Sequence, residues 1–326
     1  MTVSSSLLPG SPGAHGAMKA VAFYARASAD FGRKLAATEA LLRDADARFS
    51  PLTQASSLGA EDMVVTHLLA KLQIDASIFV LDTGMLHAET LALITRAEAR
   101  YGRTFKIYRP DAQAASQFVA EHGDDAMRRS VDLRKACCGL RKVEPLARAL
   151  ADKSGWLTGL RREQSGSRAD VPDVEMQEVV VDRALVSRAK LNPLADWTWG
   201  EVWHFIALEG IPYNPLHDEF FPSIGCAPCT RAITPGEDFR AGRWWWENES
   251  AKECGLHSGD ARASVLQSKT GAEVSVQAHV GEADVKGSAE PGRSQSESAK
   301  ECGLHASAPS SNLPISKIIP VRPVAA

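Results

Sequence analysis

Ala76-Ser-Ile-Phe-Val-Leu-Asp-Thr-Gly84 is the stretch of sequence that decides the fold. A short run of mostly apolar and β-branched residues leads directly into an Asp-Thr-Gly turn, and this pattern predicts a strand that is buried on both faces. In open α/β sheets, ligands bind beyond the carboxyl ends of the parallel strands. The stretch therefore predicts an α/β protein with a candidate ligand site at Asp82, Thr83 and Gly84.

Strand and helix patterns alternate on both sides of this stretch. Apolar residues recur at helical spacing over 30–49, and helices are also expected at about 61–72, 86–101 and 111–121. Strands are expected to begin at Leu52 and to cover 104–108, 155–160 and 179–181. Alternation at such short intervals predicts a parallel, twisted sheet with helices on both of its faces.

The overall composition excludes several classes of protein. The chain has 326 residues, with 37 basic and 40 acidic side chains, so its charge gives no general attraction to nucleic acid or to anionic membranes. No apolar run approaches the roughly 20 residues that a membrane-spanning helix needs. Residues 1–18 lack the apolar core of a secretory signal and are expected to form a flexible leader. We therefore expect a cytoplasmic protein.

A loop rich in small and hydroxyl side chains follows the strand that begins at Leu52. Ser56, Ser57 and Gly59 precede a helix that is expected to open at Glu61. Free backbone amides and the helix dipole make such a loop a candidate site for a phosphate group. Acidic residues at a helix start are also ordinary capping groups, so the loop by itself leaves a purely structural role open.

Two segments carry arginines that are suited to binding an anion. Arg161 and Arg162 lie in a polar loop after the strand expected at 155–160, and Arg240 and Arg243 stand three positions apart. Guanidinium groups bind phosphate and sulfate through paired hydrogen bonds, so both segments are candidate substrate-binding sites. The alternative for the first segment is a solvated polar loop without a ligand.

Four of the six cysteines form two tight groups. Cys137 and Cys138 are adjacent near the expected start of a helix, and Cys226 and Cys229 form a C-x-x-C motif. Four thiolates select soft metal centres such as iron–sulfur clusters, zinc or copper(I). Lys142, close to the first pair, would offset part of their negative charge. Two unrelated pairs of buried cysteines remain the alternative on residue type and spacing alone.

The C-terminal part of the chain carries a duplicated segment. Glu249-Ser-Ala-Lys-Glu-Cys-Gly-Leu-His257 recurs letter for letter as Glu297-Ser-Ala-Lys-Glu-Cys-Gly-Leu-His305, so Cys254 and Cys302 have identical neighbours. Lysine and histidine beside a cysteine lower the pKa of the thiol and favour its reactive thiolate. Residues 258–326 contain no Phe, Trp or Tyr, so we expect a disordered tail that cannot bury a core.

These motifs together resemble the bacterial assimilatory adenylyl-sulfate reductases, relatives of phosphoadenylyl-sulfate reductase. The resemblance covers roughly residues 30–257 and includes the four cysteines, the Arg-Trp-Trp-Trp-Glu segment that begins at Arg243 and the Glu-Cys-Gly-Leu-His motif. It implies an adenine nucleotide α-hydrolase-like fold, with a reductase domain over 19–257 between the leader and a tail over 258–326. It also implies one 4Fe–4S cluster per chain, on Cys137, Cys138, Cys226 and Cys229.

The resemblance further implies a reaction and roles for individual residues. A cysteine thiolate attacks the sulfur of adenylyl sulfate, AMP leaves, and thioredoxin or glutaredoxin releases sulfite from the S-sulfocysteine that remains. Cys254, with His257 beside it, is the expected nucleophile, and Cys302 is the alternative, since the family normally carries one such motif. The expected substrate-binding residues are Ser56, Ser57, Gly59, Glu61, Asp82, Thr83, Gly84, Lys142, Arg161, Arg162, Arg240 and Arg243.

The sequence leaves two other functions open. The nearer one is a phosphoadenylyl-sulfate reductase, or an enzyme that accepts both nucleotides. The more distant one is a non-catalytic redox sensor with a thiolate metal site, which would leave the Asp-Thr-Gly turn and the arginine segments without a role. The sequence sets no oligomeric state, and a homo-oligomer is one of the open alternatives.

Overall fold

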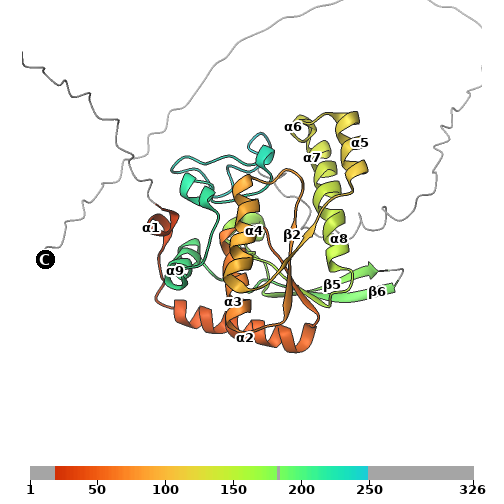
Figure 1. The fold of residues 1–326 in the computed structure, drawn as a ribbon. Coiled ribbons are helices and arrows are strands. Elements are labelled where there is room, and N and C mark those ends of the chain that lie inside the picture. The colour runs from red at the N-terminus through yellow and green to blue at the C-terminus, as the bar shows by residue number, and fades with distance from the viewer. Residues whose placement is uncertain (1–18, 182–183, 249–326) are drawn as a thin grey trace, which may run out of the picture. The chain divides into compact units, whose positions relative to one another are not determined.

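A six-stranded sheet with the order β3-β2-β1-β4-β6-β5 organises the computed structural model, which describes residues 19–181 and 184–248 (Figure 1). Its strands are β1 Leu52–Ala55, β2 Ala76–Leu81, β3 Phe105–Tyr108, β4 Gly155–Leu157, β5 Val174–Val181 and β6 Ala184–Leu191. All neighbouring pairs are parallel except β5 and β6, which pair in antiparallel register. The predicted α/β class with a parallel sheet is confirmed.

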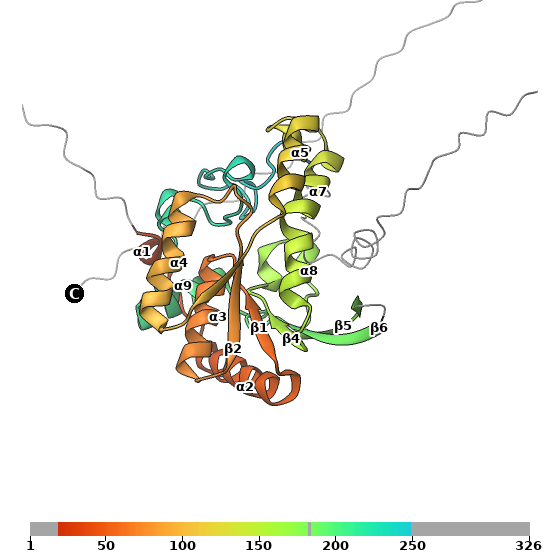
Figure 2. The same ribbon diagram turned by 45° about the vertical axis from the view of Figure 1, so that its right-hand side comes forward.

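The helices cover both faces of the sheet, as predicted. They are α1 Ala20–Tyr24, α2 Phe31–Phe49, α3 Ala60–Lys71, α4 Ala88–Tyr101, α5 Ala112–His122, α6 Ala126–Arg129, α7 Val131–Cys138, α8 Glu144–Leu150 and α9 Trp199–Glu209. Strand β2 shows how they are divided, because Ile78 and Val80 pack into the core that includes α2, α3, α4 and α9, whereas Phe79 packs against α8. Figure 2 shows α3 and α4 on one side of β1 and β2, and α8 on the other.

The last long helix shows how the sequence sets its own ends. The Thr198 hydroxyl accepts a hydrogen bond from the Glu201 amide, and the Glu201 carboxylate accepts one from the Thr198 amide, which together form a capping box at the start of α9. Gly210 ends the helix with a φ of 60°, a left-handed conformation that glycine adopts without strain. Between these ends Val202, Trp203 and Ile206 are buried in the main core.

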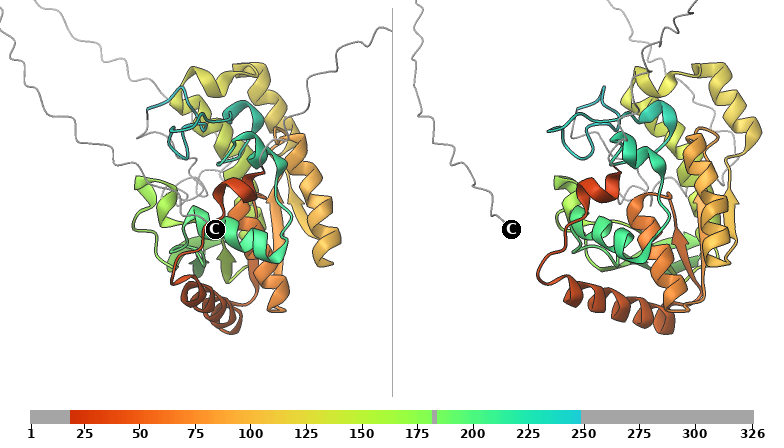
Figure 3. Two further views of the ribbon diagram at one scale, coloured as in Figure 1. Left: turned by 90° about the vertical axis from the view of Figure 1, so that its left-hand side faces the viewer. Right: turned by 60° about the vertical axis from the view of Figure 1, so that its left-hand side comes forward.

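The strand order opens a crevice between β1 and β4. Strands β2 and β3 lie on one side of β1, whereas β4 lies on the other, so the loops that leave β1 and β4 diverge. The chain after α9 lies over this carboxyl end of the sheet, as Figure 1 shows in cyan, and a short bridge joins Leu86 to Cys226 there. Figure 3 shows α2 at the opposite end. The fold thus gathers the loops from several elements at one edge.

The position expected for the cysteine pair, near the start of a helix, is wrong. Cys137 and Cys138 end α7, a π-helical turn covers Gly139–Val143, and α8 follows at Glu144 without a break. Neighbouring residues of a regular α-helix do not share a face, so two adjacent thiols normally diverge. A π-helical turn is wider, and such turns are frequent at functional sites. The charged sequence of α7 hid the first part of this continuous helix.

The edge hairpin was only partly predicted. The sequence indicated a strand at 179–181, whereas β5 spans eight residues and pairs with β6, which the sequence analysis missed. Strand β6 contains Arg188 and Lys190, which are buried although strands of a core are normally apolar. Arg188 donates hydrogen bonds to the carbonyl oxygens of Lys153 and Leu150, and Lys190 lies 5.6 Å from the centroid of the Trp156 ring. These partners make the burial of the two cations tolerable.

Several predictions concern parts of the chain that the structure does not describe. The described residues all fall within one of the two units into which the chain divides. The leader 1–18, the tail 258–326, Cys254 with His257, and Cys302 lie outside the described residues, so the predicted division at 18/19 and 257/258 stays a prediction. None of the helices within 19–181 and 184–248 combines the length and hydropathy that a bilayer-spanning segment needs.

His217 should make the stability of the fold depend on pH. Its ring is 2% exposed, its Nδ1–H donates to the Phe221 carbonyl oxygen at 2.8 Å, and burial lowers its pKa to about 4. An unfolded histidine titrates near 6.5, so between pH 4 and 6.5 the unfolded chain binds more protons. The free energy of unfolding should therefore fall by up to about 3 kcal/mol from this group as the pH drops through that window.

The substitution His217→Gln tests this, because the glutamine amide can donate to Phe221 but does not titrate. Denaturant unfolding at a series of pH values between 4 and 7 measures the slope in both proteins. We expect the wild type to lose more stability than the variant on acidification, whatever their difference at pH 7. Parallel pH profiles would show that His217 does not carry the effect.

Candidate active site and thiolate centre

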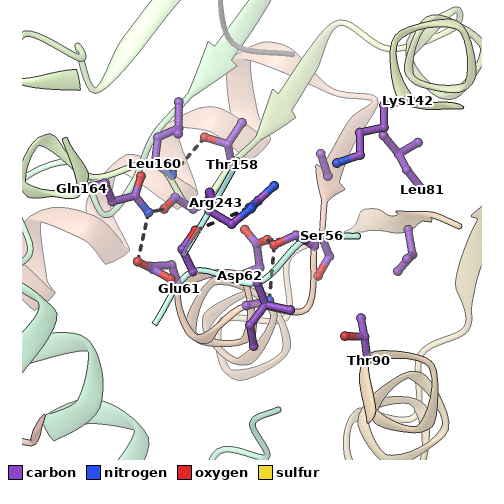
Figure 4. A pocket seen from close by; sticks show the side chains of 18 of the residues that line it. Ser56, Glu61, Asp62, Leu81, Thr90, Lys142, Thr158, Leu160, Gln164 and Arg243 are labelled. Atoms are coloured by element: carbon purple, nitrogen blue, oxygen red, sulfur yellow. Dashed lines mark hydrogen bonds between the residues drawn. The ribbon is translucent and has the colours of Figure 1, made fainter. Parts of the chain in front are cut away.

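A cavity of about 200 Å³ opens at the carboxyl edge of the sheet, in the crevice between β1 and β4. We call it the edge cavity. Many of the described residues that line it come from the loops after β1 and β4, from the π-helical turn and from the chain that follows α9, while β2, α4 and α8 add others. The lining includes Ser56, Ser57, Gly59, Glu61, Asp62, Thr158, Gly159, Lys142, Gly225, Arg240, Arg243 and Trp244. Figure 4 shows how these elements converge.

Asp62 joins the two loops that form the walls of the edge cavity. Its Oδ2 accepts hydrogen bonds from the amide and the hydroxyl of Ser57, both at 2.6 Å, and the carboxylate also accepts from the Gly159 backbone. A Cβ at Gly159 would lie 2.5 Å from Asp62 Oδ1, so only glycine lets the loops approach this closely. Burial raises the pKa of Asp62 to about 6, although the Ser57 hydrogen bonds oppose this. Sequence analysis did not select Asp62 or Gly159.

Side chains of the loop after β4 donate hydrogen bonds to the Glu61 carboxylate. Glu61 Oε1 accepts hydrogen bonds from Arg161 Nε and from Gln164 Nε2, each at 3.0 Å. Arg161 is fully buried and also pairs with Glu163 at 2.7 Å, while Arg162 pairs with Asp173 and Asp196. The structure therefore does not bring Arg161 and Arg162 to the edge cavity, because acidic partners hold both guanidinium groups elsewhere.

The charge that faces the edge cavity comes from other side chains. Its lining contains the cations Lys142, Arg168, Arg240 and Arg243, and the acids Glu61 and Asp62. Arg168 follows Arg161 and Arg162 in the polar loop after β4. The sequence analysis selected Arg161 and Arg162 as substrate-binding residues but did not select Arg168. In Figure 4 the ends of the Lys142 and Arg243 side chains point toward one another. This arrangement suits an anionic ligand.

The backbone amides of the predicted phosphate loop donate hydrogen bonds to side chains of the loop and of the helix that follows it. Ser56, Ser57 and Gly59 line the cavity as expected, but the Ser57 amide donates to Asp62, the Leu58 amide to Ser56 Oγ at 3.2 Å, and the Gly59 amide to Ser57 Oγ at 3.3 Å. These bonds hold Leu58 at a φ of 61°, which is unusual for a residue with a side chain. The loop amides are thus already engaged, so an anion would depend chiefly on the cationic side chains.

Next to the edge cavity the four predicted cysteines converge on a small hollow, which we call the thiol hollow. Its lining among the described residues consists of Met85, Met127, Arg134, Cys137, Cys138, Arg141, Lys142, Cys226, Cys229, Arg243 and Trp244. All four thiols are buried and free of disulfides. Among these described lining residues none is acidic and four are basic. The alternative of two unrelated cysteine pairs does not agree with this geometry.

The Asp-Thr-Gly turn after β2 lies beside the thiol hollow and does not line the edge cavity. Thr83 Oγ1 is 3.2 Å from Cys226 Sγ, and the Thr83 carbonyl accepts a hydrogen bond from Arg141 at 2.8 Å. Asp82 accepts from the Gly84 amide at 3.0 Å and forms an ion pair with Arg109. The turn therefore supports the thiols, whereas the sequence predicted contact with the substrate.

The chemistry of the thiol hollow fits a metal centre that replaces thiol protons. Burial raises the pKa of Cys137, and burial together with Cys226 raises the pKa of Cys229 to about 11. Burial alone would also raise the pKa of Cys226, but Lys142 and the Thr83 hydroxyl bring it below its usual value. Thiols with raised pKa values keep their protons at neutral pH unless a metal ion displaces them.

The grouping of the possible ligands bears on which kind of metal centre the thiol hollow could hold. Within 19–181 and 184–248, no three His, Cys, Asp or Glu side chains are grouped closely enough to hold one metal ion. In a 4Fe–4S cluster with four thiolate ligands each thiolate binds a different iron, so the ligands stand farther apart than around a single ion. The donor set, four thiols with cations around them, fits a soft metal centre such as an iron–sulfur cluster.

Trp244 lines both the edge cavity and the thiol hollow. It is 1% exposed and has a φ of 41°, a strained value for a bulky residue. The Cζ atoms of Arg134 and Arg243 each lie 4.6 Å from the centroid of its ring, a distance that allows cation–π attraction. Sequence analysis gave Trp244 no role, because nothing in a run of three tryptophans shows which one is buried.

Fold and site together define an α/β protein with a cationic cavity beside four buried thiols. Comparison with known proteins places this arrangement in a family. The phosphoadenosine phosphosulfate reductase domain family matches residues 51–232. An adenosine 5'-phosphosulfate reductase of Burkholderia cepacia is 50% identical over 228 residues, which are 70% of this chain and 89% of that protein. A protein of the same description from Allochromatium vinosum is 51% identical over 225 residues, or 69% of this chain and 85% of that protein.

Among solved structures, phosphoadenylyl-sulfate reductase from Candida auris aligns with a TM-score of 0.48 and 27% identity, over 62% of this chain and 97% of that chain. The sequence matches decide the assignment: the chain belongs to the phosphoadenosine phosphosulfate reductase family. This confirms the resemblance found in the sequence. The protein is therefore an oxidoreductase that acts on a sulfur group in assimilatory sulfate reduction.

The contact between Gly225 and Arg243 gives a test of the edge cavity. A Cβ at Gly225 would lie 2.3 Å from Arg243 Nη2, so Gly225→Ala must displace the guanidinium group. Hydrogen bonds to charged groups contribute about 1.5–3 kcal/mol, so we expect AMP to bind at least about tenfold more weakly. Isothermal titration calorimetry measures the affinity.

Gly166→Ala is the matched control, because a Cβ at Gly166 meets no atom within 4 Å. Its affinity for AMP should stay within about twofold of the wild type. Equal affinities of the Gly225→Ala variant and the wild type would show that Arg243 does not bind the phosphate.

Proposed function

We propose that the protein reduces adenylyl sulfate to sulfite and AMP, with thioredoxin or glutaredoxin as the reductant, as a step of cysteine biosynthesis in the cytoplasm. The observation that carries this proposal is the shared wall of the two sites. Lys142, Arg243 and Trp244 line both the edge cavity and the thiol hollow. An anionic substrate and a group of thiolates would therefore act on the same two cations.

The substrate would enter the edge cavity with its negative charge toward the cations. Lys142, Arg240 and Arg243 would bind the phosphate and sulfate groups, while the Ser56–Gly59 loop and Glu61 would contact the nucleoside. Arg161 would act indirectly, since it holds Glu61 in place. As the bond between sulfur and the bridging oxygen breaks, charge grows on the departing phosphate, and cations already in position stabilise that charge without rearrangement.

The reaction would then proceed at a cysteine of the chain. The Cys254 thiolate attacks the sulfur of adenylyl sulfate, the bond from sulfur to the bridging oxygen breaks, and AMP leaves with the bonding electrons. An S-sulfocysteine remains on Cys254. A thiolate of the reductant attacks Cys254 Sγ and displaces sulfite, and the second thiol of the reductant resolves the mixed disulfide. His257 would favour the Cys254 thiolate when it carries a proton.

We further propose that Cys137, Cys138, Cys226 and Cys229 hold one 4Fe–4S cluster per chain. When bound, the cluster would supply a compact negative charge that tunes the electrostatics of the cations beside the substrate. The chain's own residues would stabilise that charge through Arg134, Arg141 and Lys142, and Thr83 would hydrogen-bond to the sulfur of Cys226. The thiol reduction itself needs no electron carrier, because the reductant supplies both electrons.

The names of the relatives favour adenylyl sulfate over its 3'-phosphorylated form as the substrate. A competition assay with both nucleotides distinguishes an adenylyl-sulfate reductase from a phosphoadenylyl-sulfate reductase or a dual-substrate enzyme. A non-catalytic redox sensor would release no AMP in the presence of thioredoxin. The cationic edge cavity would have no role in such a sensor.

Lys142 should contribute more to the reaction than to binding. Its ammonium group faces the space beside Arg243, where charge develops on the departing phosphate (Figure 4). Lys142→Ala should reduce turnover about a hundredfold or more and weaken AMP binding much less, as for other electrostatic groups that act in the transition state. Lys106→Ala removes an exposed lysine on β3 and serves as the control. Equal losses in turnover and AMP affinity would refute a role in the transition state.

The two copies of the Glu-Cys-Gly-Leu-His motif can be tested separately. Cys254→Ser should abolish the transfer of radiolabelled sulfite to the protein from labelled adenylyl sulfate, because a serine hydroxyl is a far weaker nucleophile. Cys302→Ser should take up label like the wild type. Label that persists in Cys254→Ser and disappears in Cys302→Ser would assign the nucleophile to the second copy.

A further inference from the structure

A buried ion pair joins the helix of the cysteine pair to the end of the described chain. Arg134 on α7 donates from Nε to Glu247 Oε1 at 2.6 Å, and the two side chains are 0% and 3% exposed. Burial lowers the pKa of Arg134, but its hydrogen bond to Glu247 and the attraction of that acid raise the pKa above its ordinary value. Fully buried pairs of this kind hold a fixed geometry, because separating the charges leaves each of them without compensation.

Glu247 lies next to the end of the described part of the chain. The Glu247 amide donates to the Trp244 carbonyl at 2.9 Å, and the Trp244 amide donates to the Cys229 carbonyl at 3.4 Å, so a tight turn ends at Glu247. Asn248, the next residue, is exposed and is the last described residue. Cys254 follows Glu247 by only seven positions in the sequence.

The same guanidinium group also contacts the thiol hollow. Arg134 forms a hydrogen bond with Cys138 and lies 4.6 Å from the centroid of the Trp244 ring, which lines both sites. One buried cation therefore links a thiol of the hollow, the wall between the sites and the acid near the end of the described chain.

Glu247 has a second oxygen that the described residues do not use. Glu247 Oε2 is buried and has no hydrogen-bond partner among residues 19–181 and 184–248. Buried carboxylate oxygens in native proteins nearly always have a partner. Among the described residues, the pair with Arg134 thus engages Oε1 alone.

We propose that the Arg134–Glu247 pair fixes the position and direction of the backbone at Glu247, and that it thereby positions the Cys254 nucleophile, which follows seven residues later, for its reaction. This inference rests on the proposed function. Seven residues reach at most about 25 Å when fully extended, so the origin of the segment limits where the thiol can go. The effective concentration of a tethered group depends steeply on that origin, and a displacement of about 1 Å can cost a hundredfold in rate.

Glu247 is a positioning residue on this account, so its loss should affect one step and spare others. In a single turnover without reductant, radiolabelled adenylyl sulfate transfers label to the protein. Glu247→Gln removes the charge and keeps the shape, and we expect it to slow this transfer at least about tenfold. AMP affinity and the absorbance and iron content of the protein should stay near wild-type values, since Glu247 lines neither site. Glu247→Asp keeps the charge and should recover part of the rate.

Glu209→Gln is the control for a neutralised ion pair. Glu209 pairs with Lys71 at 2.7 Å, and it lines neither the edge cavity nor the thiol hollow. Its rate of label transfer should equal that of the wild type. Equal rates in Glu247→Gln and the wild type would overturn the inference alone, and so would a loss of AMP affinity or iron in proportion to the rate. A wild type that accepts no label would overturn the proposed function and this inference with it.

Discussion

Burial of several cations around four thiols is the constraint on which the rest of the structure depends. Arg134, Arg141 and Arg243 are all buried, and all three line the thiol hollow. A buried charge without an acidic partner is costly, and within residues 19–181 and 184–248 Glu247 pairs with Arg134 alone of the three. In the proposed function, the positive charge that the described acids leave would be balanced by one anion in the hollow and another in the edge cavity. Thiolates on a metal centre and an anionic substrate meet both requirements.

The fold brings these two requirements together at one edge. The strand order reverses between β1 and β4, where the loops with Ser57 and Gly159 diverge and Asp62 then joins them. The helix that continues from α7 through a π-helical turn into α8 carries two of the thiols to the same edge. Because Lys142 and Trp244 belong to both sites, a change of charge in one is felt in the other.

The sequence predicted the fold better than it predicted the site. Short apolar segments such as 76–81 alternate with helical patterns along the chain, and this order indicates a parallel sheet. The sequence therefore predicted β2 and its neighbouring strands. Strand β6 was missed because Arg188 and Lys190 break its apolar pattern, and their buried partners come from distant parts of the chain.

The thiols could be selected by residue type, since four clustered cysteines have few other uses. The substrate-binding arginines could not be selected in this way, because the charge of a residue does not show whether its guanidinium group is already paired with an acid. Arg161 is paired with Glu61, which is a hundred positions away, and Arg168 faces the cavity in its place.

Absorbance spectroscopy of the anaerobically purified protein, with iron and sulfide assays, tests the central claim most directly. We expect a brown protein with about four iron and four sulfide ions per chain. A colourless protein that is folded and reduces adenylyl sulfate at full rate would contradict this account.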